Sequence, residues 1–468
     1  MSYTTKPAGL DVSSKEILWT IWKLAWPSVL LYLSITLAFF LSFKIVSPLG
    51  TEALAGISSG QRIYFLISSV VMGLGAGTTA MVSREWGRNN INEASAYAKL
   101  SLLVGILLGV FVVLLFNEIA PEVSTFFKLK GANHEAATDY VRMLSHFGVF
   151  LSFFLLSGVA MRAISDAVTP LVITMITNVL LLVFSMMLTH GYFGLPALGL
   201  RGSAIGTGLA YLIGTVMYLI VWYSKRYPLK ANVKNYTDRV KVRRLFKIAT
   251  PGMLEQLLLQ LSLIGFMWVV GRYSSTAFAA YGIGLSVFGV TLVFGIGFSV
   301  AGAALVGQQL GAGKKANAVA YAHHTLHLSL VFMLMAGVIL FMLSGSIARF
   351  LSHDPELIEL TTFVLRMMAL AQPLLAFEFA IGGALRGAGD TRYTLMITVI
   401  CYVGVRVVVS YAFLKMGLSI YWIYSVLLVD YSLKSILLYL RLRSGKWLEI
   451  MERNESIIPA PEPLTHDP

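Results

Sequence analysis

The segment ALRGAGDTRYTL, residues 384–395, separates two long apolar runs and carries Arg386, Asp390 and Arg392. A related segment, MRAISDAVTPL, begins at residue 161. Between residues 161–176 and 385–400, six of sixteen positions are identical, including the arginine, the aspartate and the LxIT that follows. Chance similarity of apolar segments produces matching Leu and Ile, but not readily Arg and Asp at one spacing. We therefore interpret the segment as one copy of an internal repeat.

The repeat extends along most of the chain at one constant spacing. Three further pairs share the spacing that aligns residue 161 with residue 385: KLAWP at 23–27 with KIATP at 247–251, AYA at 96–98 with AYA at 320–322, and Gly87 with Gly311. Proline and glycine match as well as apolar residues, so the similarity is more than composition. We infer that the chain consists of two related halves, and we call residues aligned by this spacing equivalent.

The composition predicts that lipid is the solvent for most of this chain. Of its 468 residues, 57% are hydrophobic and 13% are charged, whereas soluble domains carry about 25% charged residues. Apolar windows of about 20 residues, the length needed to cross a bilayer as a helix, recur twelve times. They lie at 17–46, 54–82, 94–116, 139–161, 168–190, 198–223, 244–271, 277–306, 318–343, 361–385, 394–415 and 419–440. The windows are continuous rather than alternating, which favours helices over a barrel. We predict an all-α integral membrane protein with twelve transmembrane helices.

Each half contains six predicted spans, so both halves enter the membrane from the same side. This predicts two six-helix bundles related as parallel repeats, with a binding site near the midplane between them. We expect an N-terminal cytoplasmic tail at 1–16, an N-terminal lobe at 17–223, a basic cytoplasmic linker at 224–243, a C-terminal lobe at 244–442 and a C-terminal cytoplasmic tail at 443–468.

The net charge of +13 is distributed unevenly over the predicted loops. Most cations lie on the side of the N-terminus, including a cluster within 225–247, whereas the other side holds only Lys128, Lys130, Arg201, Arg272, Arg349 and Lys415. Because cationic loops remain in the cytoplasm, we predict that both termini are cytoplasmic. The basic charge then serves orientation at an anionic lipid surface and does not require nucleic acid as a partner.

Each repeated polar segment is expected to be the tight cytoplasmic turn between spans four and five of its half. The glycines allow positive φ, and the arginine and aspartate can cap helix ends and pair there. We assign this structural hinge role to Arg162, Asp166, Arg386, Gly387, Gly389 and Asp390.

Four ionisable residues lie inside predicted spans of the second half: Glu255, Glu378, Arg406 and Asp430. A charge at the bilayer centre costs about 2.5–3.5 kcal/mol on insertion scales and persists with a partner or a function. A buried carboxylate that exchanges a proton for an arriving cation would produce antiport. Structural alternatives remain open. Asp430 and Lys434 are one turn apart and can form an ion pair, and Arg406 can pair with Asp430 or Glu378. Glu255 has no cation within its span, so it is our leading coupling residue, for a proton or for sodium.

Several motifs resemble those of the multidrug and toxic compound extrusion (MATE) transporters. They are LRGAGDTRYTL at 385–395, LVGQQLGAG at 305–313, YVGVRVVVSY at 402–411 and LVDYSLKSILLYLRLRSGKW at 428–447. The resemblance covers nearly the whole chain. It implies two six-helix lobes in a V around a central cavity and export of organic, often cationic, compounds in exchange for protons or sodium.

The N-terminal half departs from the family pattern. Where many members carry acidic residues or asparagine in spans one and five, this chain has Ser42, Leu181 and Ser185. Lys44 lies nearby, either reaching outward to the interface or acting as a fixed positive charge in the cavity. The latter would make the cavity less favourable for cationic drugs.

These observations predict a cation-coupled antiporter that exports small organic compounds, including cationic drugs, by alternating access. The alternative is a lipid-linked precursor flippase of the same superfamily. No clustered catalytic residues, Walker motif or cysteine-based metal site is present, and the chain has one cysteine, Cys401. We therefore expect no enzyme activity and no cofactor beyond the coupling ion. We also expect a monomer in a bacterial inner or plasma membrane.

Overall fold

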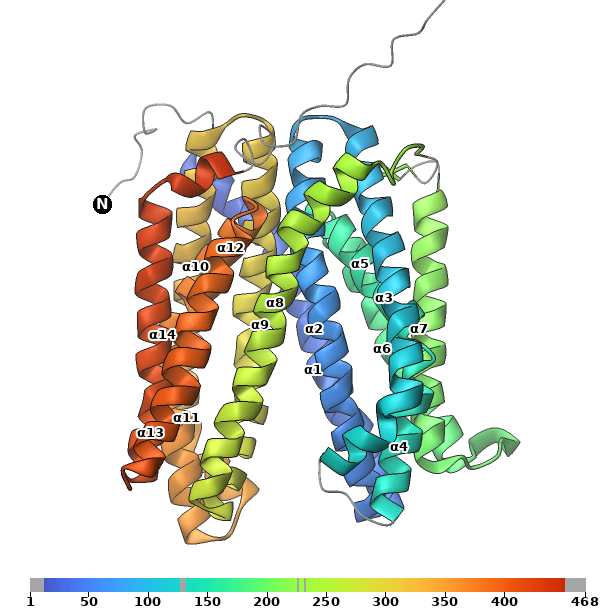
Figure 1. Cartoon of the computed structure of the whole chain (residues 1–468), viewed down its shortest axis with the longest axis vertical. Helices are drawn as coiled ribbons and strands as arrows, with labels where there is room; N and C mark the ends of the chain where they lie inside the picture. The colour runs from blue at the N-terminus through green and yellow to red at the C-terminus, as the bar shows by residue number, and fades with distance from the viewer. Residues whose placement is uncertain (1–11, 127–131, 225–226, 231–232, 451–468) are drawn as a thin grey trace, which may run out of the picture.

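The computed structural model describes residues 12–126, 132–224, 227–230 and 233–450, and within these residues it is helical with no strand. The first bundle contains α1 (Ser14–Val46), α2 (Thr51–Gly87), α3 (Ile91–Phe126), α4 (Ala132–Ser145), α5 (Gly148–Ala163), α6 (Val168–His190) and α7 (Gly199–Tyr223). The second contains α8 (Arg239–Tyr273), α9 (Ser275–Gly311), α10 (Lys315–Leu351), α11 (Pro355–Gly387), α12 (Thr391–Thr398), the π-helix η3 (Val399–Val409), α13 (Ser410–Lys415) and α14 (Ile420–Arg443). Figure 1 shows these two bundles side by side.

The predicted twelve membrane spans are confirmed by these helices. Among the described residues, ten helical segments are long and apolar enough to cross a bilayer, with α12, η3 and α13 together forming one of them. The bent pair of α4 and α5 supplies another. The remaining span is α2, with 37 residues, which runs through the first bundle beside the others (Figure 1).

Two predicted spans are less regular than the sequence indicates. The span expected at 139–161 is two helices, α4 and α5, that meet at an angle of 57°. At the break, the Ser145 hydroxyl donates to the Arg142 carbonyl and His146 Nδ1 lies 2.6 Å from the same oxygen. Such side chains compete with the backbone for the carbonyl, which bends helices. The span expected at 394–415 contains the 11-residue π-helix η3, and π-helical turns are frequent at functional sites.

The N-terminal parts of α1 and α8 each pack into the core of the opposite bundle. Ile21, Leu24 and Ala25 of α1 belong to the core of the second bundle. The equivalent residues of the second repeat, Leu245, Ile248 and Ala249 of α8, belong to the core of the first bundle. Accordingly α1 packs along α9 and α8 packs along α2. This reciprocal packing is the arrangement expected of two repeats related by a two-fold axis.

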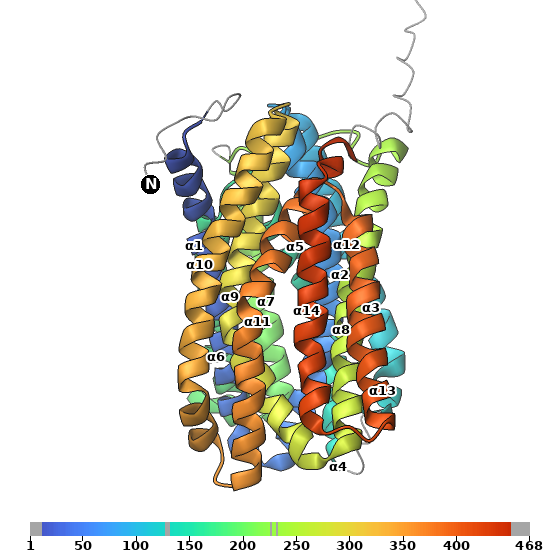
Figure 2. The same cartoon turned by 90° about the vertical axis from the view of Figure 1, so that its left-hand side faces the viewer.

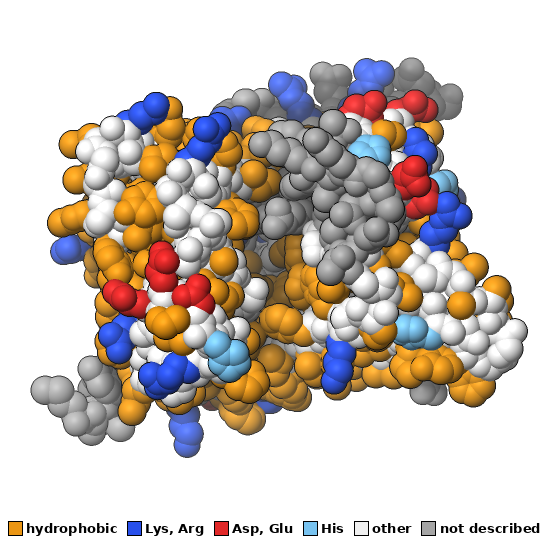
Figure 3. All heavy atoms as spheres, turned by 90° about the horizontal axis from the view of Figure 1, so that it is seen from below, with side chains coloured by type: hydrophobic (Ala, Val, Ile, Leu, Met, Phe, Trp, Pro, Cys, Tyr) orange, Lys and Arg blue, Asp and Glu red, His pale blue; other side chains and the backbone are white. Residues whose placement is uncertain are grey.

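The two ends of the molecule differ. α1 begins and α14 ends at the same end, which we call the termini end (Figure 2). Seen from the opposite end, the surface is hollowed between the two bundles, and the visible walls of the hollow are mainly hydrophobic (Figure 3). The helices therefore surround a central recess that faces away from the termini end.

Candidate functional site

The two repeated polar segments form tight turns, as the sequence predicts. They join α5 to α6 and α11 to α12. Gly389 has φ 81°, and Ser165, at the equivalent position of the first repeat, has φ 67°. The expected role of Gly387 is wrong in detail. It is the last residue of α11 rather than a positive-φ position, and a Cβ there would overlap the carbonyl oxygen of Ala303 in α9. Gly387 is therefore needed for close helix packing.

The arginine and aspartate of the second turn do not pair with each other as expected. Arg386 Nη1 donates to Glu255 Oε1 over 2.9 Å, which joins α11 to α8. Asp390 instead accepts from Arg441 Nε of α14 over 2.7 Å. In the α5–α6 turn, Asp166 accepts from the backbone N–H of Thr169, near the start of α6, over 3.0 Å.

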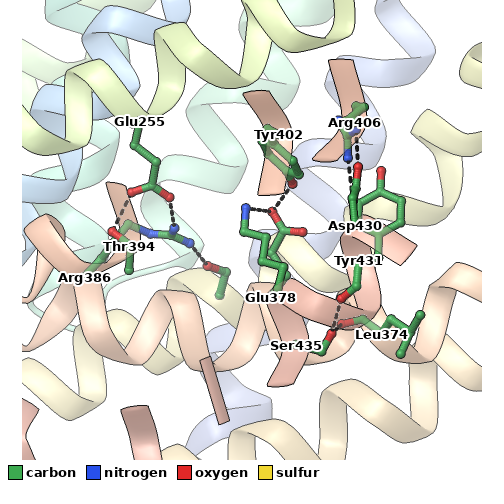
Figure 4. A network of polar contacts seen from close by, with 12 residues as sticks. Glu255, Leu374, Glu378, Arg386, Thr394, Tyr402, Arg406, Asp430, Tyr431 and Ser435 are labelled. Carbon is green, nitrogen blue, oxygen red and sulfur yellow. Dashed lines mark hydrogen bonds and ion pairs between the residues drawn. The ribbon is translucent and has the colours of Figure 1, made fainter. Parts of the chain in front are cut away.

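Glu255, our leading coupling residue, is buried in α8 and has polar partners from two other helices. Besides Arg386, the Thr394 hydroxyl of α12 donates to Glu255 Oε2 over 2.7 Å. Arg386 Nη2 also donates to the Ser299 hydroxyl of α9 over 3.1 Å. Glu255 is 4% exposed. The cation that its own span lacks is thus supplied by the hinge, 131 residues away (Figure 4).

Glu378 of α11 forms a second buried pair. Lys434 Nζ of α14 donates to Glu378 Oε1 over 2.7 Å, and the Tyr402 hydroxyl of η3 donates to the same oxygen over 2.5 Å. The other oxygen, Oε2, is buried and has no hydrogen-bond partner among the described residues. Lys434 thus contacts Glu378 in place of the expected neighbour Asp430.

Arg406 and Asp430 form the third pair, one of the two pairings that the sequence left open for this arginine. Arg406 Nε donates to Asp430 Oδ2 over 2.5 Å and Nη2 donates to Oδ1 over 3.2 Å. The guanidinium carbon lies 4.0 Å from the ring centre of Tyr402 and 5.0 Å from that of Tyr431. Arg406 is 1% exposed and Asp430 is fully buried. The aromatic faces stabilise the cation in this dry environment.

The structure therefore brings Glu255, Glu378, Asp430 and Arg406 into a set of buried ion pairs inside the second bundle, which Figure 4 shows in one view. Three carboxylates face three cations, so the set is neutral when all six groups are charged. Because a buried charge without a partner costs several kcal/mol, protonation of any one acid would leave a surplus cation. Protonation of one of these acids would therefore weaken the contact between the two helices that its ion pair joins.

Sequence reasoning missed four members of this network: Tyr402, Thr394, Ser299 and Arg386, the last having been assigned to the hinge alone. A signal for Arg386 was present in the repeat. Both halves carry the hinge arginine, but the residue of the first half that is equivalent to Glu255 is Leu31. An acid that appears in one copy only, while its arginine appears in both, indicates that only the second copy can form this pair.

The corresponding region of the first bundle contains hydroxyl and amide groups. Ser42 and Ser185 are buried, and their hydroxyls donate to the carbonyls of Ala38 and Ser203. Asn178 of α6, another residue that the sequence reasoning missed, donates to the Ser34 hydroxyl of α1 over 3.0 Å. Polar contacts thus join α1 to α6 without a carboxylate at the family positions.

Lys44 and Arg162 lie outside the ionic network. Lys44 is exposed in the last turn of α1, at the end opposite the termini end, and its role in the cavity stays a prediction. Arg162 is buried at the end of α5. Within the part of the chain that the structure describes, no group of three or more His, Cys, Asp or Glu side chains is placed to hold a metal ion.

Two helical bundles around a central recess, with buried ion pairs inside one bundle, define a multi-pass membrane transporter. Comparison with known families identifies which one: the MatE family model matches twice, at residues 27–187 and 251–412. The two matches begin at Pro27 and Pro251, which are equivalent positions of the internal repeat. The chain belongs to the MatE family, whose members are transporters rather than enzymes.

Relatives and solved structures agree with this assignment. The chain is 24% identical over 402 residues to a probable multidrug resistance protein NorM of Thermotoga maritima, covering 85% of this chain and 86% of the relative. It is 26% identical to an FAD transporter of Shewanella oneidensis, covering 75% and 78%. Its fold matches a MOP superfamily transporter from Pyrococcus furiosus with TM-score 0.85 at 18% identity, covering 92% and 97%. A MATE transporter of Vibrio cholerae also matches with TM-score 0.85 at 17% identity, covering 95% and 99%.

Proposed function

We propose that this transporter exports small organic compounds in exchange for protons, and that Glu255 is the carboxylate through which the proton is coupled. The observation that supports this most directly is the ion pair between Glu255 and Arg386, which joins α8 to the turn between α11 and α12. A proton on Glu255 would neutralise the acid and release the hinge arginine. The net charge at this site would then change with protonation of Glu255. That change would act on the turn that joins α11 to α12.

Protons fit this site better than sodium. A bound sodium ion needs several oxygen ligands, whereas both Glu255 oxygens already have donors, Arg386 and Thr394. A second cation beside the guanidinium would also be repelled. A proton needs a single oxygen and can displace the arginine. Sodium coupling is therefore the alternative outcome of the test rather than the proposal.

The proposed cargo is a small organic molecule that enters the recess between the bundles. The similarity to multidrug resistance proteins favours drugs. Cationic drugs are included because the sequence motifs resemble those of MATE transporters. The similarity to an FAD transporter makes an anionic nucleotide the natural comparison substrate. The lipid-linked precursor flippase considered from the sequence has no observation in its favour among these relatives. With the termini in the cytoplasm, as the cation distribution predicts, the recess in this structure faces outward.

The test is transport in proteoliposomes, with pH and sodium gradients imposed separately. Ethidium and FAD serve as the cationic and anionic probes. Glu255→Gln keeps the side-chain shape and cannot exchange a proton, so we expect uptake to fall to the level seen without a gradient while the protein stays folded. Glu359→Gln is the matched control, because Glu359 is an exposed carboxylate of the same bundle, bonded to Tyr421, and it should transport like the wild type.

Three results would contradict the proposal. Uptake driven by sodium but not by a pH gradient would assign the coupling to sodium. Equal loss in both variants would show that Glu255 acts no differently from a surface acid. Wild-type transport of neither probe under either gradient would remove the proposed antiport of these substrate classes.

A further inference from the structure

The turn between α5 and α6 binds the opposite bundle through one side chain of α9. Gln308 Nε2 donates to the Ala163 carbonyl over 2.8 Å and to the Ser165 hydroxyl over 2.9 Å. The Ser165 hydroxyl also lies 3.2 Å from Gln308 Oε1, to which it can donate in turn. These bonds connect the second bundle to the first at the termini end of the molecule.

Ser165 is held in an unusual backbone conformation at this contact. Its φ of 67° lies in the left-handed region, which residues other than glycine rarely adopt. The second repeat has Gly389, with φ 81°, at the equivalent position. Glycine would be the unstrained choice in the first repeat too. A serine there supplies the hydroxyl that meets Gln308, so the strain coincides with the contact between bundles.

Around Gln308 the central helices of the two bundles meet backbone to backbone. A Cβ on Gly87 of α2 would overlap the Gln308 carbonyl, and a Cβ on Gly311 of α9 would overlap the Arg84 carbonyl. Arg84 and Gln308 are equivalent positions of the two repeats, as are Gly87 and Gly311. The two contacts are therefore reciprocal across the two-fold axis and close the termini end tightly, while the opposite end is hollowed (Figure 3).

We propose that Gln308 and the α5–α6 turn form a latch that holds the two bundles together at the termini end and breaks when the molecule opens there. The glycine contacts set the closest approach of α2 and α9, and the side-chain bonds of Gln308 hold that approach. Ser165 is exposed, so water can replace its bond as the bundles separate. The latch rests on the proposed function only because it requires a second, oppositely open state. It does not depend on the coupling ion or the substrate.

Distances between spin labels on the two bundles test the latch directly. Tyr223 at the end of α7 and Leu440 near the end of α14 are both exposed at the termini end. They are replaced by labelled cysteines after Cys401→Ser removes the one natural cysteine. Loss of the Gln308 bonds in Gln308→Ala should raise the ratio of long-distance to short-distance populations roughly 5- to 30-fold. Ser165→Gly is compatible with the positive φ of the turn, removes the side chain that carries the hydroxyl and should raise the ratio about fivefold.

The matched control is Gln309→Ala. Gln309 neighbours Gln308, but its amide oxygen accepts from Asn317 Nδ2 of α10 within the same bundle, so its loss should leave the distances of the labelled parent unchanged. Unchanged distances in both Gln308→Ala and Ser165→Gly would overturn the latch, as would an equal shift in all three variants. If Gln308→Ala does not fold, the latch is tested by comparing the label distances of Ser165→Gly with those of Gln309→Ala. If the distances shift as expected but the wild type shows no gradient-driven transport, the result counts against the proposed function and not against the latch.

Discussion

We predict that the ion pair formed by Arg406 and Asp430 stabilises the fold and does not couple the ion to transport. Asp430→Asn should lower the free energy of unfolding by about 3–5 kcal/mol, because removing one partner of a buried pair leaves the other charge uncompensated. The structure supports the upper part of this range. Both side chains are at most 1% exposed, and both Asp430 oxygens accept bonds from the guanidinium.

The double variant Arg406→Met with Asp430→Leu should be less destabilised than Asp430→Asn alone. Replacing a buried pair by apolar residues of similar volume is often nearly neutral, because neither charge then needs desolvation. Its remaining cost is the lost cation–π contact of the guanidinium with Tyr402 and Tyr431, about 0.5–2 kcal/mol. The coupling energy between the two sites should therefore be about 3 kcal/mol or more.

The assay is thermal unfolding in detergent, followed by size-exclusion chromatography with fluorescence detection. It compares Asp430→Asn with a double-mutant cycle made of Arg406→Met, Asp430→Leu and their double variant. Proteoliposome transport is measured on the same variants. We expect Asp430→Asn to show the lowest midpoint and the double variant to recover most of the loss. If Asp430 serves structure, the double variant also keeps pH-driven transport. An unfolding midpoint of Asp430→Asn equal to that of the wild type would refute the reasoning. So would a loss of stability in the double variant equal to the sum of the losses in its two single variants.

Two further predictions concern the hinge and the cavity. Gly387→Ala should destabilise the fold by about 1–3 kcal/mol, as overpacking does, because its Cβ would overlap a carbonyl of α9; Gly389→Asn should be tolerated, since asparagine accepts positive φ. Equal unfolding midpoints for these two variants would show that the contact of Gly387 with α9 can relax. Lys44→Gln should leave transport of ethidium and FAD unchanged, because Lys44 is exposed at the end of α1 and outside the ionic network. A change in the relative uptake of ethidium and FAD would instead place the charge of Lys44 in the substrate path.

Much of the architecture could be predicted because lipid restricts the chain severely. Continuous apolar windows must be helices when no water is present to satisfy the backbone. An even number of spans per repeat requires the halves to enter from the same side. The constant spacing between equivalent residues then predicts their two-fold relation, which the reciprocal packing of α1 and α8 bears out.

The candidate site could be predicted only in part. Ionisable residues in apolar spans stand out by the cost of burying charge, which led to Glu255, Glu378, Arg406 and Asp430. Their partners did not stand out. Lys434 lies one turn after Asp430, yet it binds Glu378, 56 residues away. Arg386 lies at a turn, yet it reaches Glu255 in another helix.

The number of spans, their repetition and the need for polar partners inside the membrane could be predicted from the amino-acid pattern alone. These follow from local hydrophobicity and spacing, which do not depend on how helices pack. Helix packing settles which charges meet, where the α4–α5 span bends, and that Gln308 reaches the first bundle. Each helix residue points about 100° from the one before it, so a small rotation or shift of one helix changes every partner. That rotation is set by packing across the whole bundle rather than by any one segment.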